Sequence, residues 1–169
     1  MTLITASGEK PDDYVRIDSA EAASSVEAPV LVPLALAGTV LAAGSNRRFG
    51  LSVPNSAAVN EIAPFFAAVD LIAVEFPSFS DGRGLSLAKR LRREGFAGTL
   101  RASGPLIVDQ FAETLACGFD EIELPQASAN RQPVQQWMAA KDVISARYQS
   151  GYDTAEASIL QQRLAARKA

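Results

Sequence analysis

The sequence predicts an α/β protein with a mainly parallel sheet of about five or six strands in consecutive β-α units. Over residues 49–124, short apolar runs rich in branched side chains alternate with segments of helical period, as parallel β-α units do. The 169 residues suit one domain that buries roughly 70% of the surface of its unfolded chain. Both an open sheet and a partial barrel fit this spacing, whereas a complete eight-fold barrel takes ~250 residues.

Strand signals begin near residue 14. Residues 1–13 are polar and lack periodicity, which indicates a flexible arm, so the α/β domain is expected over residues 14–150. Tyr14–Ile17 alternates like a short half-exposed strand, and Pro29–Val32 is an apolar run typical of a buried one. The later strands are expected at Phe49–Val53, Leu71–Phe76, Thr99–Ala102 and Glu121–Leu124.

Prolines and glycines delimit the expected helices. Proline is tolerated at the first helical position but breaks a helix interior, and glycine favours the left-handed turn that ends a helix. The expected helices cover Pro33–Ala42, a stretch from about Ala57 that Pro64 breaks, Leu85–Glu94, a segment from Gly104-Pro105 to Gly118, and residues 133–148, with a loop at residues 125–132.

Residues 151–169 are expected to form a C-terminal helix that starts at Asp153. Its apolar stripe is narrow, so it fits docking on its own domain or on a partner subunit. The sequence therefore leaves open whether the protein forms a homodimer.

The composition excludes much chemistry. The chain has no histidine and one cysteine, Cys117. Histidine-based nucleophile pairs, histidine metal ligands, an internal disulfide and a dithiol redox pair are therefore excluded, and no side-chain metal site is expected. Cys117 follows an apolar helix and is interpreted as a packing residue, since no histidine can activate it.

The charge balance argues against nucleic acid and membranes. The net charge is −3, which does not suggest binding to a duplex or to an anionic bilayer. Residues 29–45 are uncharged but too few to span a bilayer, which takes about 20 residues, and acidic residues precede them. Cytoplasmic residence is therefore the default expectation.

A candidate anion site follows the expected strand at Leu71–Phe76. Asp81, Gly82, Arg83 and Gly84 combine a tight turn, a close backbone approach and a guanidinium at the start of a helix. Such a segment suits phosphate, sulfate or carboxylate. The structural alternative is that Asp81 caps the helix while Arg83 pairs with Glu75 or Asp109.

Arg101 lies inside a strand that looks buried, and Asp109 and Gln110 follow in the next helix. A buried guanidinium needs a partner, so a structural ion pair with Asp109, Glu75 or Glu123 is the favoured interpretation.

Two further groups of charged residues have structural interpretations. Glu121 and Glu123 share one face of their strand, where an open face explains them more simply than acid-base catalysis does. Lys89, Arg90, Arg92 and Arg93 are interpreted as a solvated helix face, with steering of an acidic partner as the alternative.

Several short motifs together match a known bacterial family. They are Phe76–Ala88 (FPSFSDGRGLSLA), Leu100–Ala102, Gly104, Asp109-Gln110, Cys117–Asp120 and Arg147–Gln149. In these motifs, and over roughly residues 29–150, the sequence resembles domain of unknown function 934. Members are typically encoded beside assimilatory sulfite reductase, which implies a role in sulfite or sulfate reduction. The candidate residues in the matching motifs are Asp81, Arg83, Arg101, Asp109 and Gln110.

The resemblance leaves three hypotheses open. The first is an accessory protein of sulfite reduction that binds sulfite reductase or a small anion such as sulfite, sulfate or phosphate. The second is an oxidoreductase that borrows a flavin or a nicotinamide, NAD(P), although no GxGxxG follows an expected strand. The third is a structural dimer without a ligand.

Overall fold

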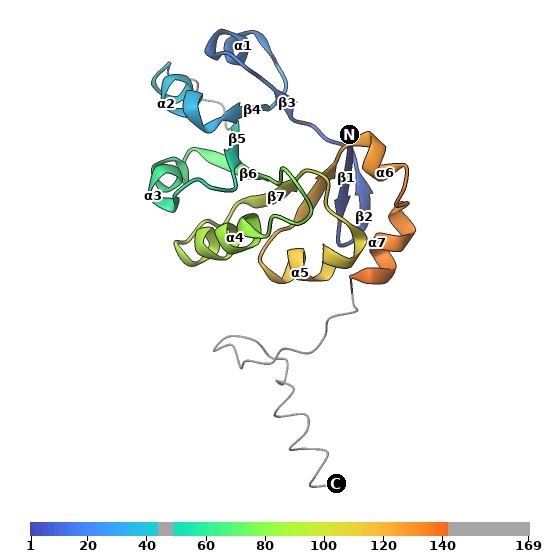
Figure 1. Ribbon diagram of the computed structural model, residues 1–169. Helices are drawn as coiled ribbons and strands as arrows, with labels where there is room; N and C mark the ends of the chain where they lie inside the picture. The colour runs from blue at the N-terminus through green and yellow to red at the C-terminus, as the bar shows by residue number, and fades with distance from the viewer. Residues whose placement is uncertain (44–48, 142–169) are drawn as a thin grey trace, which may run out of the picture.

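Eight strands form one curled sheet in the computed structural model, which describes residues 1–43 and 49–141 (Figure 1). The strands are β1 (Thr2–Thr5), β2 (Gly8–Lys10), β3 (Val15–Arg16), β4 (Val30–Pro33), β5 (Phe49–Pro54), β6 (Val69–Glu75), β7 (Thr99–Ser103) and β8 (Glu121–Leu124). Their order in the sheet is β2-β1-β8-β7-β6-β5-β4-β3. Strands β3 to β8 are parallel neighbours in chain order, whereas β1 is antiparallel to both β8 and β2. The mainly parallel α/β class is confirmed, and the sheet is open because β2 and β3 lie at opposite edges.

The number of strands exceeds the predicted five or six because β1 and β2 lie within residues 1–13, the segment expected to be a flexible arm. Strand β1 pairs with β8 over its whole length, and Leu3 and Ile4 are buried on its two faces. Leu3 and Ile4 are adjacent and both buried, so this short strand shows no apolar-polar alternation and periodicity could not reveal it.

The helices follow the expected order with shifted boundaries. They are α1 (Ala20–Ser25), α2 (Leu34–Ala42), α3 (Val59–Ile62), α4 (Arg83–Arg93), α5 (Phe111–Ala116), α6 (Gln126–Ala129) and α7 (Val134–Ala140), with 3₁₀ turns at Ala63–Phe65 and Val108–Gln110. Pro64 converts the end of α3 into a 3₁₀ turn, as predicted. Gly104-Pro105 does not open a helix, because Gly104 has a φ of 147° and Ile107 is extended. Helix α1 and the single turn α6 were not expected, and the helix expected over residues 151–169 lies outside the described residues.

The two faces of the sheet differ in chemistry. Helices α2, α3, α4 and α5 lie around the outer side of the curl (Figure 1). Alternate strand residues on that side, such as Leu51, Ile72 and Leu100, are fully buried in the main apolar core. The side chains of the opposite parity occupy the inner side of the curl, and many are polar; they are Ser52, Glu75, Arg101, Ser103, Glu121 and Glu123.

The glycines of the DGRG motif have packing roles that position the loop after β6. The ring of Phe76 covers the Cα of Gly84, where any Cβ would overlap the ring. A Cβ added to Gly104 would likewise overlap the carbonyl oxygen of Phe76. The positive φ of Gly104 also favours glycine. Phe76 N also donates to Ser103 O at 2.7 Å. Phe76 therefore joins the loops that follow β6 and β7.

Arg92 fixes the turns that follow α4 and α5. Its guanidinium donates to the carbonyl oxygens of Gly118 (3.0 Å), Phe96 (2.9 Å) and Gly98 (2.7 Å) and to the carboxylate of Asp120 (2.7 Å). The prediction of a solvated face was therefore wrong for Arg92, because its side chain turns back over the end of its own helix. Lys89, Arg90 and Arg93 are exposed.

Two glycine-to-alanine variants test the packing role of the motif. We expect Gly84→Ala to lower the free energy of unfolding by about 2–3 kcal/mol, because the added methyl group displaces the Phe76 ring. The matched control is Gly82→Ala, which has no atom within 4 Å of the new Cβ and a φ of −74°, and should cost less than about 1 kcal/mol. Urea unfolding of both variants measures the difference, and equal losses would contradict the packing role.

Candidate functional site

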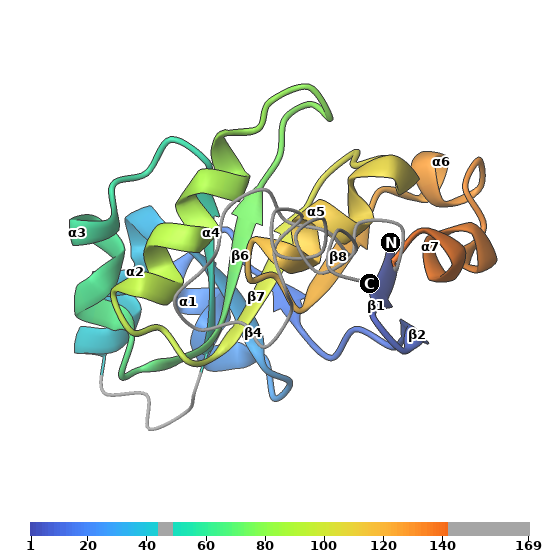
Figure 2. The same cartoon turned by 90° about the horizontal axis from the view of Figure 1, so that it is seen from below.

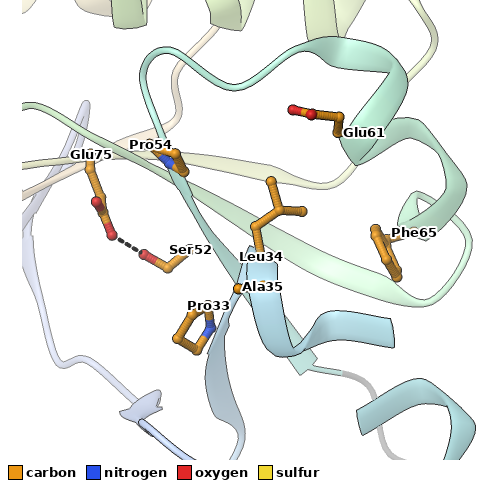
Figure 3. A pocket seen from close by; sticks show the side chains of 8 residues that line it. All are labelled: Pro33, Leu34, Ala35, Ser52, Pro54, Glu61, Phe65 and Glu75. Atoms are coloured by element: carbon orange, nitrogen blue, oxygen red, sulfur yellow. Dashed lines mark hydrogen bonds between the residues drawn. The ribbon is translucent and has the colours of Figure 1, made fainter. Parts of the chain in front are cut away.

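A pocket of about 560 Å³ opens at the carboxyl ends of β4, β5 and β6 (Figure 3). Its lining comes from the strand ends (Pro33, Ser52, Pro54, Glu75), from the start of α2 (Leu34, Ala35) and from α3 and the turn after it (Glu61, Phe65). Ligands of parallel α/β proteins usually bind at this edge of the sheet. The sequence placed candidate residues at the same edge but after β6 and β7, so it missed this pocket.

The pocket combines two carboxylates with apolar walls. Ser52 Oγ donates to Glu75 Oε1 at 2.7 Å, which holds this carboxylate at the pocket wall (Figure 3). Glu61 Oε2 accepts a hydrogen bond from Ala58 N at 3.0 Å. Leu34 and Phe65 are its main apolar side chains, and no lining residue is basic. The charge of the pocket favours an uncharged or cationic ligand over an anion.

Ser52 also connects the pocket to a set of ion pairs on the inner side of the curl. Ser52 Oγ lies 3.5 Å from Nη1 of Arg16 on β3. Arg16 Nη2 donates to Glu123 Oε2 at 2.6 Å and to Ser103 Oγ at 2.9 Å. A continuous polar path therefore runs from Glu75 in the pocket to the carboxylates of β8.

Arg101 lies at the centre of this set. Its Nε donates to Glu121 Oε1 at 2.8 Å, and its Nη1 and Nη2 each lie 2.9 Å from one oxygen of Asp12. Glu123 Oε2 is 3.5 Å from Nη1. The Tyr14 ring lies over the guanidinium at 5.6 Å, and Arg101 is 1% exposed.

The structural ion pair predicted for Arg101 thus includes Glu123 as expected, while Asp109 and Glu75 are not its partners. Asp12, which accepts two hydrogen bonds from Arg101, was missed because it lies in the segment expected to be an arm. Glu121 and Glu123 share one face as predicted, but that face is not open: they are 1% and 2% exposed. Both glutamates are paired with basic side chains, which are Lys10 of β2, Arg16 of β3 and Arg101.

Burial and charge shift two pKa values here. Burial would lower the pKa of Arg101, but its hydrogen bonds with Asp12 and Glu121 outweigh this effect and raise the pKa. Burial raises the pKa of Tyr14, and the nearby carboxylate of Asp70 adds to the increase. Arg101 is therefore a permanent cation, and Tyr14 a neutral ring, throughout the physiological pH range.

Asp81 lies on the loop that projects between β6 and α4 (Figure 2) and pairs with Arg83, the first residue of α4. Arg83 Nε and Nη2 donate to Asp81 Oδ1 (2.9 Å) and Oδ2 (2.7 Å), and Arg83 N donates to Oδ1 at 3.2 Å. Arg83 holds the pKa of Asp81 well below its usual range, and Asn55 adds to this effect. Neither Glu75 nor Asp109 pairs with Arg83, in contrast to the structural alternative, and Asp81 neutralises the guanidinium that was expected to attract an anion.

The remaining candidates have separate places. Gln110 Nε2 donates to Phe79 O at 2.7 Å, so Gln110 ties the projecting loop to the loop after β7. Asp109 is exposed. Gly82 precedes the first residue of α4, and Gly84 packs under Phe76. The structure thus brings Asp81, Arg83 and Gln110 to one loop cluster, whereas Arg101 lies on the inner face of the sheet.

The described residues bear on three further expectations, about metal binding, membrane spans and Cys117. Within residues 1–43 and 49–141, no group of three acidic, histidine or cysteine side chains is arranged to hold a metal ion. No helix of this part is long and apolar enough to cross a membrane. Cys117 is 3% exposed, in agreement with a packing residue.

The free energy of unfolding is expected to depend on the ionisation of Tyr14 at alkaline pH. Its pKa is raised in the folded state, so the stabilisation it provides is complete below its unfolded value of about 10 and is lost as the pH rises through the folded value. We expect the urea midpoint of the wild type to fall more steeply between about pH 9 and pH 11 than that of Tyr14→Phe. Parallel profiles would show that Tyr14 ionises as freely in the folded chain as in the unfolded one.

A protein-family model matches most of the described sheet. The model of a family described as "Bacterial protein of unknown function (DUF934)" matches residues 50–159, which is more than half of the chain. The match begins later than the resemblance expected over residues 29–150 and reaches further towards the C-terminus. No curated protein matches the chain. The residues of the DGRG, LRA and CGFD motifs all lie inside the matched region, and the chain belongs to this family of bacterial proteins.

Proposed function

We propose that this protein is an accessory protein of assimilatory sulfite reduction that binds a small organic ligand in the pocket at Glu75. The family resemblance supports the pathway, since members are typically encoded beside sulfite reductase. The pocket at the carboxyl ends of β4, β5 and β6 is the observation that supports binding. The side chains contain neither histidine nor a second cysteine, so they supply no dithiol for reduction.

The pocket has the features of a prearranged binding site. Its volume of about 560 Å³ lies within the usual range for small-molecule sites, about 300–1,000 Å³. The Ser52 hydroxyl holds the Glu75 carboxylate, so no ordering of this group is needed when a ligand binds. A ligand with an amine or hydroxyl group beside an apolar part fits this lining.

The ligand proposed for this pocket is not sulfite. A sulfite or sulfate ion there would face the carboxylates of Glu61 and Glu75 without a basic residue to bind it. The accessory role therefore consists of binding an organic ligand and contacting the reductase.

Blocking the mouth of the pocket tests the binding role. Ala35 is exposed at the start of α2 and lines the pocket, so Ala35→Trp should fill the entrance without disturbing the core. We expect this variant to restore growth of a deletion strain on sulfate at least about tenfold less well than the wild type, if ligand binding limits function. Thr39→Trp is the matched control, because Thr39 is exposed on the same helix and does not line the pocket. Full complementation by Ala35→Trp would refute the pocket as the functional site.

The pathway itself is tested by growth and co-purification. A deletion strain should grow slowly with sulfate as the sole sulfur source and normally with cysteine, and the tagged protein should retain sulfite reductase. Normal growth on sulfate would refute the accessory role. A flavin spectrum from the purified protein would instead support the oxidoreductase alternative.

A further inference from the structure

Residues 11–14, here called the strap, connect the two opposite edges of the sheet. Strand β2 ends at Lys10 on one edge, and β3 begins at Val15 on the other. The strap therefore crosses the open side of the curl, over the inner face that carries Arg101 (Figure 1). Pro11, Asp12 and Asp13 are exposed, although they cover a guanidinium that is 1% exposed.

The contact between Asp12 and Arg101 has the geometry of a bound oxyanion. Two parallel hydrogen bonds of 2.9 Å join the Asp12 carboxylate to Nη1 and Nη2. This fork arrangement is the one by which arginine binds carboxylate, phosphate and related anions. The sheet itself supplies only the contacts of Glu121 and Glu123. The edge of the guanidinium formed by Nη1 and Nη2, here called the seat, binds Asp12 from outside the sheet. The side chain of Asp12 is 27% exposed.

The Nη1 and Nη2 atoms of Arg101 need an acceptor at this seat. Lys10 pairs with Glu121, and Arg16 pairs with Glu123. Asp12 supplies the bidentate contact to Nη1 and Nη2 of Arg101, so removal of its carboxylate leaves two donor atoms of a buried guanidinium without this acceptor. Buried donors that lack an acceptor are destabilising, which favours uptake of an anion from solution.

Besides Asp12, the strap is attached through Tyr14, whose side chain packs against Leu31, Leu71 and Ala73. Tyr14 N donates to Asp12 Oδ1 at 3.1 Å, and the Tyr14 ring lies over Arg101. No side-chain hydrogen bond or ion pair is found for Asp13 within the described part of the chain. Displacing one carboxylate would therefore release residues 11–13 of the strap from the inner face, while Tyr14 stays packed on the sheet.

We propose that Arg101 is the centre of a masked site for a small oxyanion, and that the Asp12 carboxylate is an internal stand-in that such an oxyanion displaces. Sulfate, sulfite and phosphate share the required chemistry, which is a pair of charged oxygens facing Nη1 and Nη2. The site is separate from the pocket at Glu75 and does not rest on the proposed function.

Removing the stand-in charge tests the proposal. In the full chain, Asp12→Asn should bind sulfate at least about tenfold more tightly than the wild type, because closure by the strap lowers the apparent affinity of a masked site. Isothermal calorimetry with sulfate, sulfite and phosphate, each against chloride at equal ionic strength, measures the affinity and identifies the preferred anion. The matched control is Asp13→Asn, which removes the same charge from the neighbouring exposed position and should behave like the wild type. Equal affinity of the Asp12→Asn and Asp13→Asn variants for all three anions would overturn the proposal.

A measurement on the wild type keeps the proposal testable if Asp12→Asn does not fold. Cleavage before Asp12 or Asp13 by a protease specific for aspartate should be faster in sulfate than in chloride of equal ionic strength, because the anion releases the strap. An unrelated substrate of the same protease corrects for effects of the salt on the protease. Cleavage at the same corrected rate in both salts would overturn the proposal. Growth complementation by Ala35→Trp tests the pocket alone, so failure of the proposed function and failure of the masked site remain distinguishable.

Discussion

A guanidinium buried on the inner face of the sheet must be neutralised, and the position of Arg101 sets this requirement for the whole domain. Two carboxylates come from the neighbouring strand β8, and the third comes from the segment between β2 and β3. Because β2 and β3 lie at opposite edges, the contact with Asp12 holds the connection between the edges over the curl. An apolar barrel interior contains no charge that must be neutralised, so it would need no such connection. The ion pairs therefore explain why the inner face of this open sheet is covered.

The family motifs describe mainly how loops are held at the carboxyl edge. Phe76 packs on Gly84 and Gly104, and Arg92 joins the turn at Gly118 to Asp120. Glycines and carbonyl oxygens make these contacts. The contacts restrict which residue types fit at these positions, and they need no bound ligand to do so. A motif that is specific enough to identify a family is therefore compatible with a structural role for most of its residues.

The acidic pocket and the masked guanidinium place opposite charges at two separate positions of one polar path. Glu75 faces the pocket, while Arg101 lies further along the inner face, with Ser52, Arg16 and Glu123 between them. Coulomb interactions of paired, partly buried charges are local, so the two positions can differ in the charge of the group they bind. The projecting loop of Asp81 and Arg83 is neutral by its own ion pair and contributes little to either field.

Sequence analysis alone predicted the α/β class, the parallel strands and the helix end at Gly118, because apolar periodicity and backbone conformation are local properties. It also indicated that Arg101 needs a buried partner and that Glu121 and Glu123 share a face. The folded structure was needed to show that β1 and β2 extend the sheet, that Asp12 is a partner of Arg101 and that Ser52, Glu61 and Glu75 share one pocket. These depend on which distant segments meet when the sheet curls: 89 positions separate Asp12 from Arg101, and no pattern within one strand or helix records that distance.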